Sequence, residues 1–170
     1  MKSMVRAAAL VAALIAAPAS AEEVHCIALD MPEQDYFALS DVLFEGSDET
    51  PDSFETSSVK CMAENGWDDA HLEAAQQFAL YAAGFDVAMS LLADDGVTMD
   101  QVDTLMLSIP GDVARRWGGD QGEWTADDEK LVADRMAAAG IESSDSRFGL
   151  LQLAAIAALG MKSAEEVFQL

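Results

Sequence analysis

Imidazole and thiol side chains, which commonly act as a base, a nucleophile or a metal ligand, are few in this chain of 170 residues. The candidate imidazole bases are its two histidines, His25 and His71, and the candidate thiols are its two cysteines, Cys26 and Cys61. Histidine and cysteine are the usual ligands of zinc, but their spacing here matches no zinc-binding motif. The sequence also lacks an HExxH motif and a nucleophile elbow, the signatures of two large hydrolase classes. It therefore favours a protein with no catalytic residues, no metal and no cofactor.

The other residues whose types suggest a binding role lie together in the second half of the chain. The turn that follows residues 110–111 carries Arg115, Arg116 and Trp117, the only concentrated basic and aromatic group after the first segment. On an acidic protein such a group is a candidate contact for a carboxylate ligand or a partner, as is His71. The alternative is a helix C-terminus with favourable dipole pairing, a core tryptophan and a partly buried histidine at a helix start.

The N-terminal segment has the features of a secretory signal peptide. Lys2 and Arg6 precede an apolar run over residues 7–17, and residues 19–21 read Ala-Ser-Ala, a small-residue cleavage signal. The apolar run is too short to span a bilayer. We therefore expect the mature chain to start at Glu22 and to be periplasmic or secreted, with no transmembrane segment.

The two cysteines are predicted to form a disulfide. Cys26 and Cys61 are too far apart for a CxxC redox site, and an exported chain enters an oxidising compartment. Their bond would close a loop of 36 residues. In the chain-entropy model a loop of that length stabilises the fold by roughly 3 to 4 kcal/mol.

The predicted mature chain is strongly acidic. It has 31 acidic and seven basic residues, a formal charge of −24. Such a field repels nucleic acid and anionic membrane surfaces, and it favours a basic protein of the envelope as a partner. The alternative is that the acidic side chains only solvate the outer faces of helices.

Two segments predict helices that are buried at the centre of the fold. Residues 68–93 place apolar side chains on nearly every helical face, which is typical of a buried helix. Residues 146–159 include Gln152 as the only polar side chain between Phe148 and Leu159. We expect this second helix to lie against the first, with alanines on both allowing a close approach.

Shorter helices are expected to pack around this pair. Gly160 is expected to end the second buried helix, before a short last helix capped by Ser163 and Glu166. Proline, glycine and capping residues predict the other helices over about 32–44, 51–65, 98–109 and 125–139.

The expected helix starts have capping residues. Asp68 is the expected N-cap of the first buried helix, after Gly66 ends the helix before it. Two pairs of residues have the spacing of a capping box, Thr98 with Gln101 and Thr125 with Asp128.

The sequence as a whole predicts an all-α fold, a compact bundle of about six to seven helices around the two buried ones, with one disulfide. Residues 22–170 are expected to form a single domain after the signal peptide of residues 1–21. A weak subdivision at the glycine-rich turn of residues 118–122 is the alternative.

The sequence favours a non-catalytic function. We expect an exported binding or assembly module of the bacterial envelope, because the chain lacks catalytic motifs and its charge suits the recognition of basic surfaces. A sharper alternative is an inhibitor or immunity protein for a basic cell-wall enzyme. The competing class is a hydrolase that uses carboxylates together with His71 or Arg116.

Overall fold

The computed structural model describes residues 23–44, 46–119 and 122–170. Within these ranges every element of regular structure is a helix, so the predicted all-α class is confirmed. The predicted signal peptide and the predicted first mature residue, Glu22, lie outside the described residues. None of the described helices combines the length and the apolar composition that a bilayer span requires.

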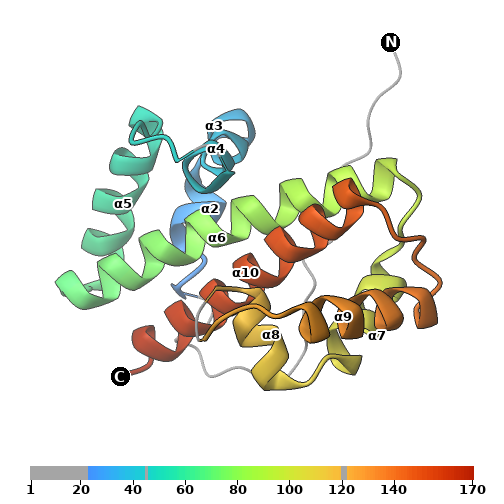
Figure 1. Ribbon diagram of the computed structural model, residues 1–170. Helices are drawn as coiled ribbons and strands as arrows, with labels where there is room; N and C mark the ends of the chain where they lie inside the picture. Colours follow the sequence, from blue (N-terminus) through green and yellow to red (C-terminus); the bar gives the residue numbers. More distant parts are fainter. Residues whose placement is uncertain (1–22, 45, 120–121) are drawn as a thin grey trace, which may run out of the picture.

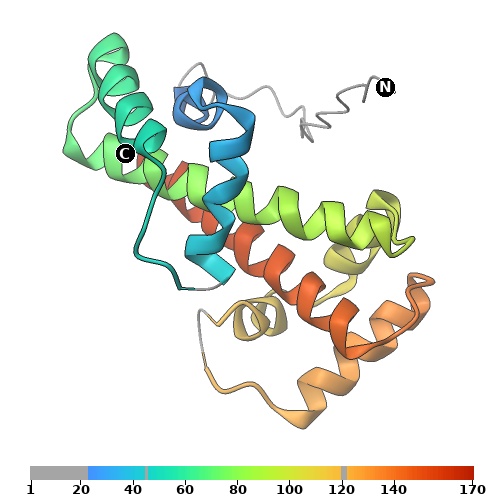
Figure 2. The same ribbon diagram turned by 90° about the horizontal axis from the view of Figure 1, so that it is seen from above.

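Two long helices, α6 (Asp69–Asp94) and α10 (Asp145–Phe168), lie side by side through the middle of the molecule (Figures 1 and 2). They have 26 and 24 residues, which corresponds to about 39 and 36 Å of helix. They are antiparallel, because the N-terminal half of α6 shares a core with the C-terminal end of α10. The predicted central pair is therefore confirmed. The small residues buried along it are Ala74, Ala75, Ala79, Ala83 and Ala88 in α6 and Ala154, Ala155, Ala157 and Ala164 in α10.

Local sequence explains where α6 begins. Asp68 is its N-cap, and Asp68 Oδ1 accepts hydrogen bonds from the backbone N–H groups of Ala70 and His71 at 3.1 and 3.0 Å. The preceding helix ends at Gly66, whose φ of 70° lies in the left-handed region that glycine adopts without strain. Both features agree with the sequence prediction.

Gly160 lies inside α10, where the sequence predicted a helix end. The helix continues to Phe168, so the predicted separate last helix capped by Ser163 and Glu166 is wrong. A Cβ atom at position 160 would lie 2.5 Å from Cγ and Cε2 of Tyr81 in α6. Glycine is therefore needed where the two long helices cross closely, and it does not mark a helix end.

Shorter helices cover one side of α6 (Figure 2). Their bounds are α2 (Cys26–Asp30), α3 (Glu33–Ala38), α4 (Ser40–Phe44) and α5 (Asp52–Asn65).

The segment predicted as one helix over residues 32–44 is divided into α3 and α4 at Leu39. The hydroxyl of the buried Ser40 donates a hydrogen bond to the carbonyl of Phe37 at 2.8 Å. The backbone N–H of Leu39 bonds three residues back, to the carbonyl of Tyr36 at 3.1 Å. Tight turns and side-chain bonds of this kind interrupt the α-helical pattern, which explains the extra element.

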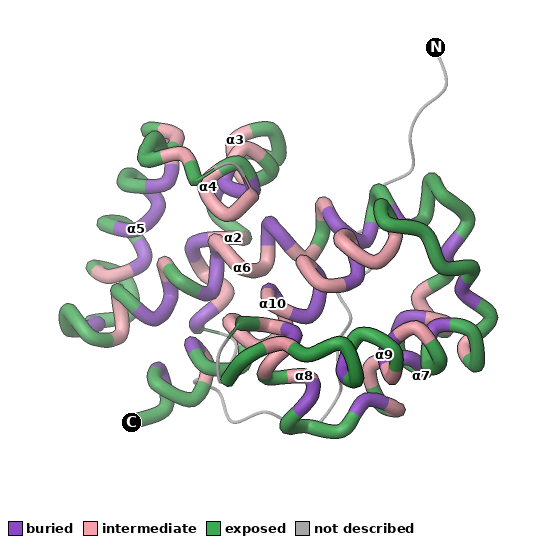
Figure 3. The backbone as a smooth tube through the Cα atoms, in the orientation of Figure 1, coloured by how far each residue is buried: buried purple, intermediate pink, exposed green. Residues whose placement is uncertain are grey.

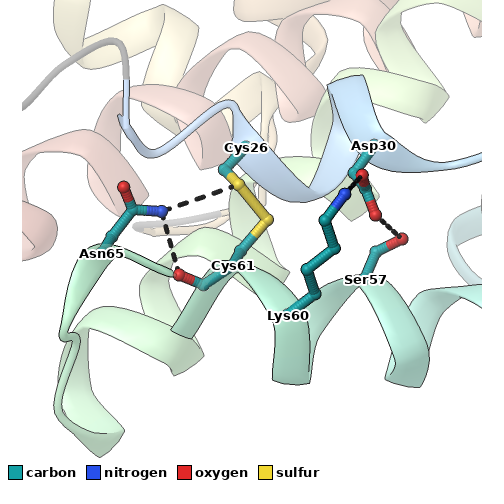
Figure 4. The surroundings of a disulfide bond; sticks show 6 residues. All are labelled: Cys26, Asp30, Ser57, Lys60, Cys61 and Asn65. Carbon is teal, nitrogen blue, oxygen red and sulfur yellow. Dashed lines mark hydrogen bonds and ion pairs between the residues drawn. A yellow bond between two sulfur atoms is a disulfide. The ribbon is translucent and has the colours of Figure 1, made fainter. Parts of the chain in front are cut away.

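The predicted disulfide joins α2 to α5 (Figure 4). Cys26 and Cys61 are bonded, with their Cα atoms 6.0 Å apart. One turn further along, Asp30 accepts a hydrogen bond from the Ser57 hydroxyl at 2.9 Å and forms an ion pair with Lys60. The two helices are thus held together by one covalent bond and by a polar cluster beside it.

The remaining helices pack on the other half of the central pair (Figure 1). Two of them begin with capping boxes, in which Thr98 pairs with Gln101 and Thr125 pairs with Asp128, as the sequence predicted. The residues expected to form a short turn before the glycine-rich segment form α8. The bounds are α7 (Met99–Ser108), α8 (Gly111–Trp117) and α9 (Ala126–Ala138).

The buried hydrophobic residues form two clusters that share α6 and α10. Figure 3 marks the buried positions along the chain. One cluster joins the C-terminal half of α6 and the N-terminal half of α10 with α7, α8 and α9. The other joins the opposite ends of the long helices with α2, α3 and α5. Helices α8 and α9, on either side of the glycine-rich turn, contribute to the same cluster through Val113, Trp117, Val132 and Met136.

Candidate functional site

Arg116 joins α8 to α9 through a bidentate ion pair with Asp128. Its Nε donates to Asp128 Oδ2 at 3.0 Å, and its Nη2 donates to Asp128 Oδ1 at 2.7 Å. Its Nη1 donates to Asp112 Oδ2 at 3.2 Å, one turn back along α8. Asp128 is also the N3 residue of the capping box of α9 and accepts a hydrogen bond from the hydroxyl of the N-cap residue, Thr125, at 2.8 Å. The hydrogen bonds of Arg116 therefore hold the end of α8 against the start of α9.

Electrostatics favour the charged form of both partners. The hydrogen bonds from Arg116 hold the pKa of Asp128 well below its usual range, with a further contribution from Thr125 and an opposing one from desolvation. The hydrogen bonds that Arg116 donates to Asp128 raise the pKa of its guanidinium. Among the described residues, Asp128 is the one acidic residue that is buried, with 6% of its surface exposed. A buried carboxylate that lost this partner would be costly, so the pair is a structural element of this site.

Trp117 and Arg115 lie in environments different from that of Arg116. Trp117 is fully buried, and its ring packs against Phe148 and Trp124 with centroid distances of 5.5 and 6.4 Å. Arg115 is exposed and forms no hydrogen bond or ion pair with the described residues. Of the three adjacent candidates, Arg115 is the side chain with a free charge, and its role as a partner contact remains a prediction.

His71 lies at the start of α6, away from this group. Its Nδ1 is 2.6 Å from Asp68 Oδ1, and its ring packs edge-on against Phe168 with centroids 5.1 Å apart. Helix α8 instead meets the middle of α10, where Gly118 approaches Leu159. Nine residues of α10 separate these two places, about 13 Å of helix. The structure therefore does not bring His71 and Arg116 into one site.

The four histidines and cysteines are also not assembled as ligands. Cys26 and Cys61 are bonded to each other in a disulfide, and the ring of His25 packs against Phe78 with centroids 4.4 Å apart. Within the described ranges, no three side chains of His, Cys, Asp or Glu are grouped as a metal site requires.

The feature that the sequence prediction missed is an uneven distribution of charge along the chain. Residues 22–114 contain 21 acidic residues and Lys60 as the single basic one, a formal charge of −20. Residues 115–170 contain ten acidic and six basic residues, a formal charge of −4. Counting charges separately for the two parts would have revealed this, whereas the total of −24 does not.

The acidic side chains of the first part are available to solvent. Every acidic residue within 23–44 and 46–114 is exposed, with the exception of the half-buried Asp35. Among the described residues of this part, only Asp30, Asp95 and Asp112 form ion pairs with a lysine or arginine. The acidic part, as we name residues 22–114, therefore presents mostly uncompensated negative charge.

The ion pair of Arg116 gives a testable difference between two adjacent arginines. Replacing Arg116 with alanine is expected to lower the melting temperature by several degrees, because Asp128 would be left buried without its cation. Replacing the exposed Arg115 with alanine should change the melting temperature by less than about 2 °C. Differential scanning calorimetry measures both, and equal effects of the two substitutions would contradict this role.

The same pair makes stability depend on pH in a defined direction. The folded-state pKa of Asp128 is depressed, so its contribution is fully present above the ordinary carboxyl range of about 4 and is lost as the pH falls below it. The advantage of the unsubstituted protein over R116A should therefore shrink progressively as the pH falls below about 4, and calorimetry of both proteins across this pH range measures it.

The candidate residues thus form a structural ion pair, a buried aromatic cluster and a histidine bound to the N-cap of its own helix, beside a long acidic part. No protein-family model, curated protein or solved structure matches this chain.

Proposed function

We propose that this chain is an exported, non-catalytic binding or assembly module of the bacterial envelope that recognises a basic protein through its acidic part. The observation that carries the proposal is the formal charge of −20 on residues 22–114, where nearly every described acidic side chain is exposed. Signal-peptide features at the N-terminus and a disulfide between Cys26 and Cys61 support an oxidising, exported location.

The distribution of charge supports recognition over simple solvation. Solubility requires only a modest net charge on a surface where charges of both signs are interspersed. Here the basic residues are concentrated after residue 114, and those at Arg116, Lys130 and Arg147 are bound to acidic side chains nearby. A strongly negative, exposed segment of this kind accelerates encounter with a partner of opposite charge and repels polyanions.

The sharper version of the proposal is an inhibitor or immunity protein. In this version the basic partner is a cell-wall enzyme, and binding blocks its active site. The same acidic charge supports it, because fast, electrostatically steered association suits a protein that must neutralise an enzyme.

Capture from envelope extract tests the proposal. The oxidised protein is immobilised, loaded at low ionic strength and eluted with rising salt, and the eluate is analysed by mass spectrometry. We expect one basic protein to be released in a narrow salt window, because screening weakens exposed charge pairs within a Debye length of about 10 Å. A cell-wall hydrolase in the eluate whose turnover falls on adding this protein would establish the inhibitor version.

The control is the same matrix carrying a basic protein of similar size, which should not retain that partner. The absence of any protein released specifically by salt would overturn recognition of a basic envelope protein under these conditions.

A further inference from the structure

A surface depression lies between α9 and the first turns of α10. Its volume is about 340 Å³, and its walls include Glu129 from α9 and Asp145, Phe148, Gly149 and Gln152 from α10. The two carboxylates come from different helices, and none of the described residues that line the depression is basic. The space is large enough for a small organic group.

We propose that this depression binds a primary ammonium group at the end of a short apolar chain. Glu129 and Asp145 supply two negative charges, and Phe148 supplies an aromatic wall against which the alkyl chain can pack. Gly149 leaves room for that chain, since a Cβ atom at this position would meet no atom within 4 Å. This inference does not rest on the proposed function, because the depression lies outside the acidic part.

The negative charge of the depression is not cancelled by its neighbours. Lys130, next to Glu129, binds Asp134 at 2.8 Å, and Arg147, close to Asp145, binds a carboxylate of another segment at 2.8 Å. The positive end of the α10 dipole opposes a bound cation, but it amounts to about half a charge against two full negative charges.

The aromatic wall is held in place before any ligand arrives. The ring of Phe148 packs against Trp117 and Trp124, with centroid distances of 5.5 and 6.3 Å. The side-chain amide nitrogen of Gln152 donates to the carbonyl of Trp117 at 2.9 Å, which leaves its amide oxygen as an acceptor for the ammonium group. A wall that is already ordered lowers the entropy cost of binding.

The ammonium group has two sources, a free alkylamine and the lysine side chain of a protein. Pentylamine and N-acetyl-lysine methylamide represent these sources, and pentan-1-ol is the neutral control of the same length. Each is titrated into the full, oxidised protein at neutral pH and followed by ¹H–¹⁵N NMR. We expect saturable shifts at the Gly149 amide and the Gln152 side-chain amide with both amines. Tighter binding of the lysine derivative assigns the site to a protein side chain, and tighter binding of pentylamine assigns it to a free amine.

Two variants separate the role of charge from that of shape. The double substitution E129Q and D145N should weaken amine binding at least about tenfold, whereas the matched pair E73Q and D103N on exposed parts of α6 and α7 should leave it unchanged. Gly149→Leu should abolish binding by filling the depression while all charges remain. The NMR spectrum of each variant reports whether it is folded.

Two results would overturn the proposal. One is unchanged amine affinity in the folded E129Q and D145N protein. The other is equal binding of pentan-1-ol and pentylamine, which would mean that the depression selects an apolar chain without regard to its charge.

Discussion

Removing the disulfide is expected to lower the free energy of unfolding by about 3 to 4 kcal/mol, the largest effect that we predict for a local change. The bond between Cys26 and Cys61 spans 35 positions of the chain, and without it the unfolded state gains the entropy of an open loop. The change is made by replacing both cysteines with serine. Urea unfolding followed by circular dichroism gives the free energy, and the double variant should unfold at a lower urea concentration.

The loss should be concentrated at one end of the molecule. Helix α5 is tied to the rest of the fold largely through α2, where Asp30 and Lys60 form the neighbouring ion pair. Hydrogen exchange should therefore show loss of protection in α2 and α5 before α7, α8 and α9. Lys60→Met is the control, because it removes the exposed ion pair but keeps the disulfide and should cost much less. An unchanged urea midpoint in the cysteine variant would contradict this account of the N-terminal helices.

Replacing Gly160 with alanine is expected to destabilise the protein by about 1 to 3 kcal/mol. The added methyl group would clash with the Tyr81 ring, because it would lie 2.5 Å from the ring Cγ, closer than a van der Waals contact. Either α6 and α10 must separate or the tyrosine must move. Helix propensity alone predicts the opposite sign, a gain of up to about 1 kcal/mol for alanine over glycine. The sign of the measured change therefore decides whether the close crossing is present.

Gly149 in the same helix is the matched control. A Cβ atom at this position meets no atom within 4 Å, so Gly149→Ala should stabilise the protein by about 0.5 to 1 kcal/mol. A double-mutant cycle with Tyr81→Ala adds a second test, since Gly160→Ala should cost little once the ring is absent. A stabilising effect of Gly160→Ala with Tyr81 present would refute the crossing.

Features encoded by neighbouring residues were predictable from the sequence. The caps at Asp68, Thr98 and Thr125 depend on side chains that bond within three residues, and the structure confirms all of them. The disulfide was predictable because the chain has two cysteines and an N-terminal segment with the features of a signal peptide. The two central helices were predictable because helices that are apolar on most faces must be buried.

Features that depend on contacts between distant segments were not predictable in the same way. In the sequence alone Gly160 indicates a helix end, whereas in the structure it lies inside a helix, where Tyr81 from α6 packs against it. The same holds for Arg116, which was proposed as a free contact because its partner Asp128 lies twelve positions away, beyond the glycine-rich turn. Single-sequence patterns give the spacing of such residues but not the approach of their helices.

We propose that the acidic part, residues 22–114, recognises a basic partner. Two triple variants with the same change in charge test this claim, each replacing three exposed acidic residues with lysine. One variant carries Asp48→Lys, Glu49→Lys and Glu55→Lys in the acidic part, and the other carries Glu123→Lys, Asp127→Lys and Glu142→Lys outside it.

The measurement is the amount of the salt-eluted basic protein that each immobilised variant captures from envelope extract, relative to the unsubstituted protein. Circular dichroism first establishes that both variants are folded. Reversal within the acidic part should reduce capture by about tenfold, and reversal outside it should leave most of the capture intact, because steering depends on the charge that the partner meets first. Equal loss of capture in the two variants would show that net charge alone is responsible and would contradict recognition by the acidic part.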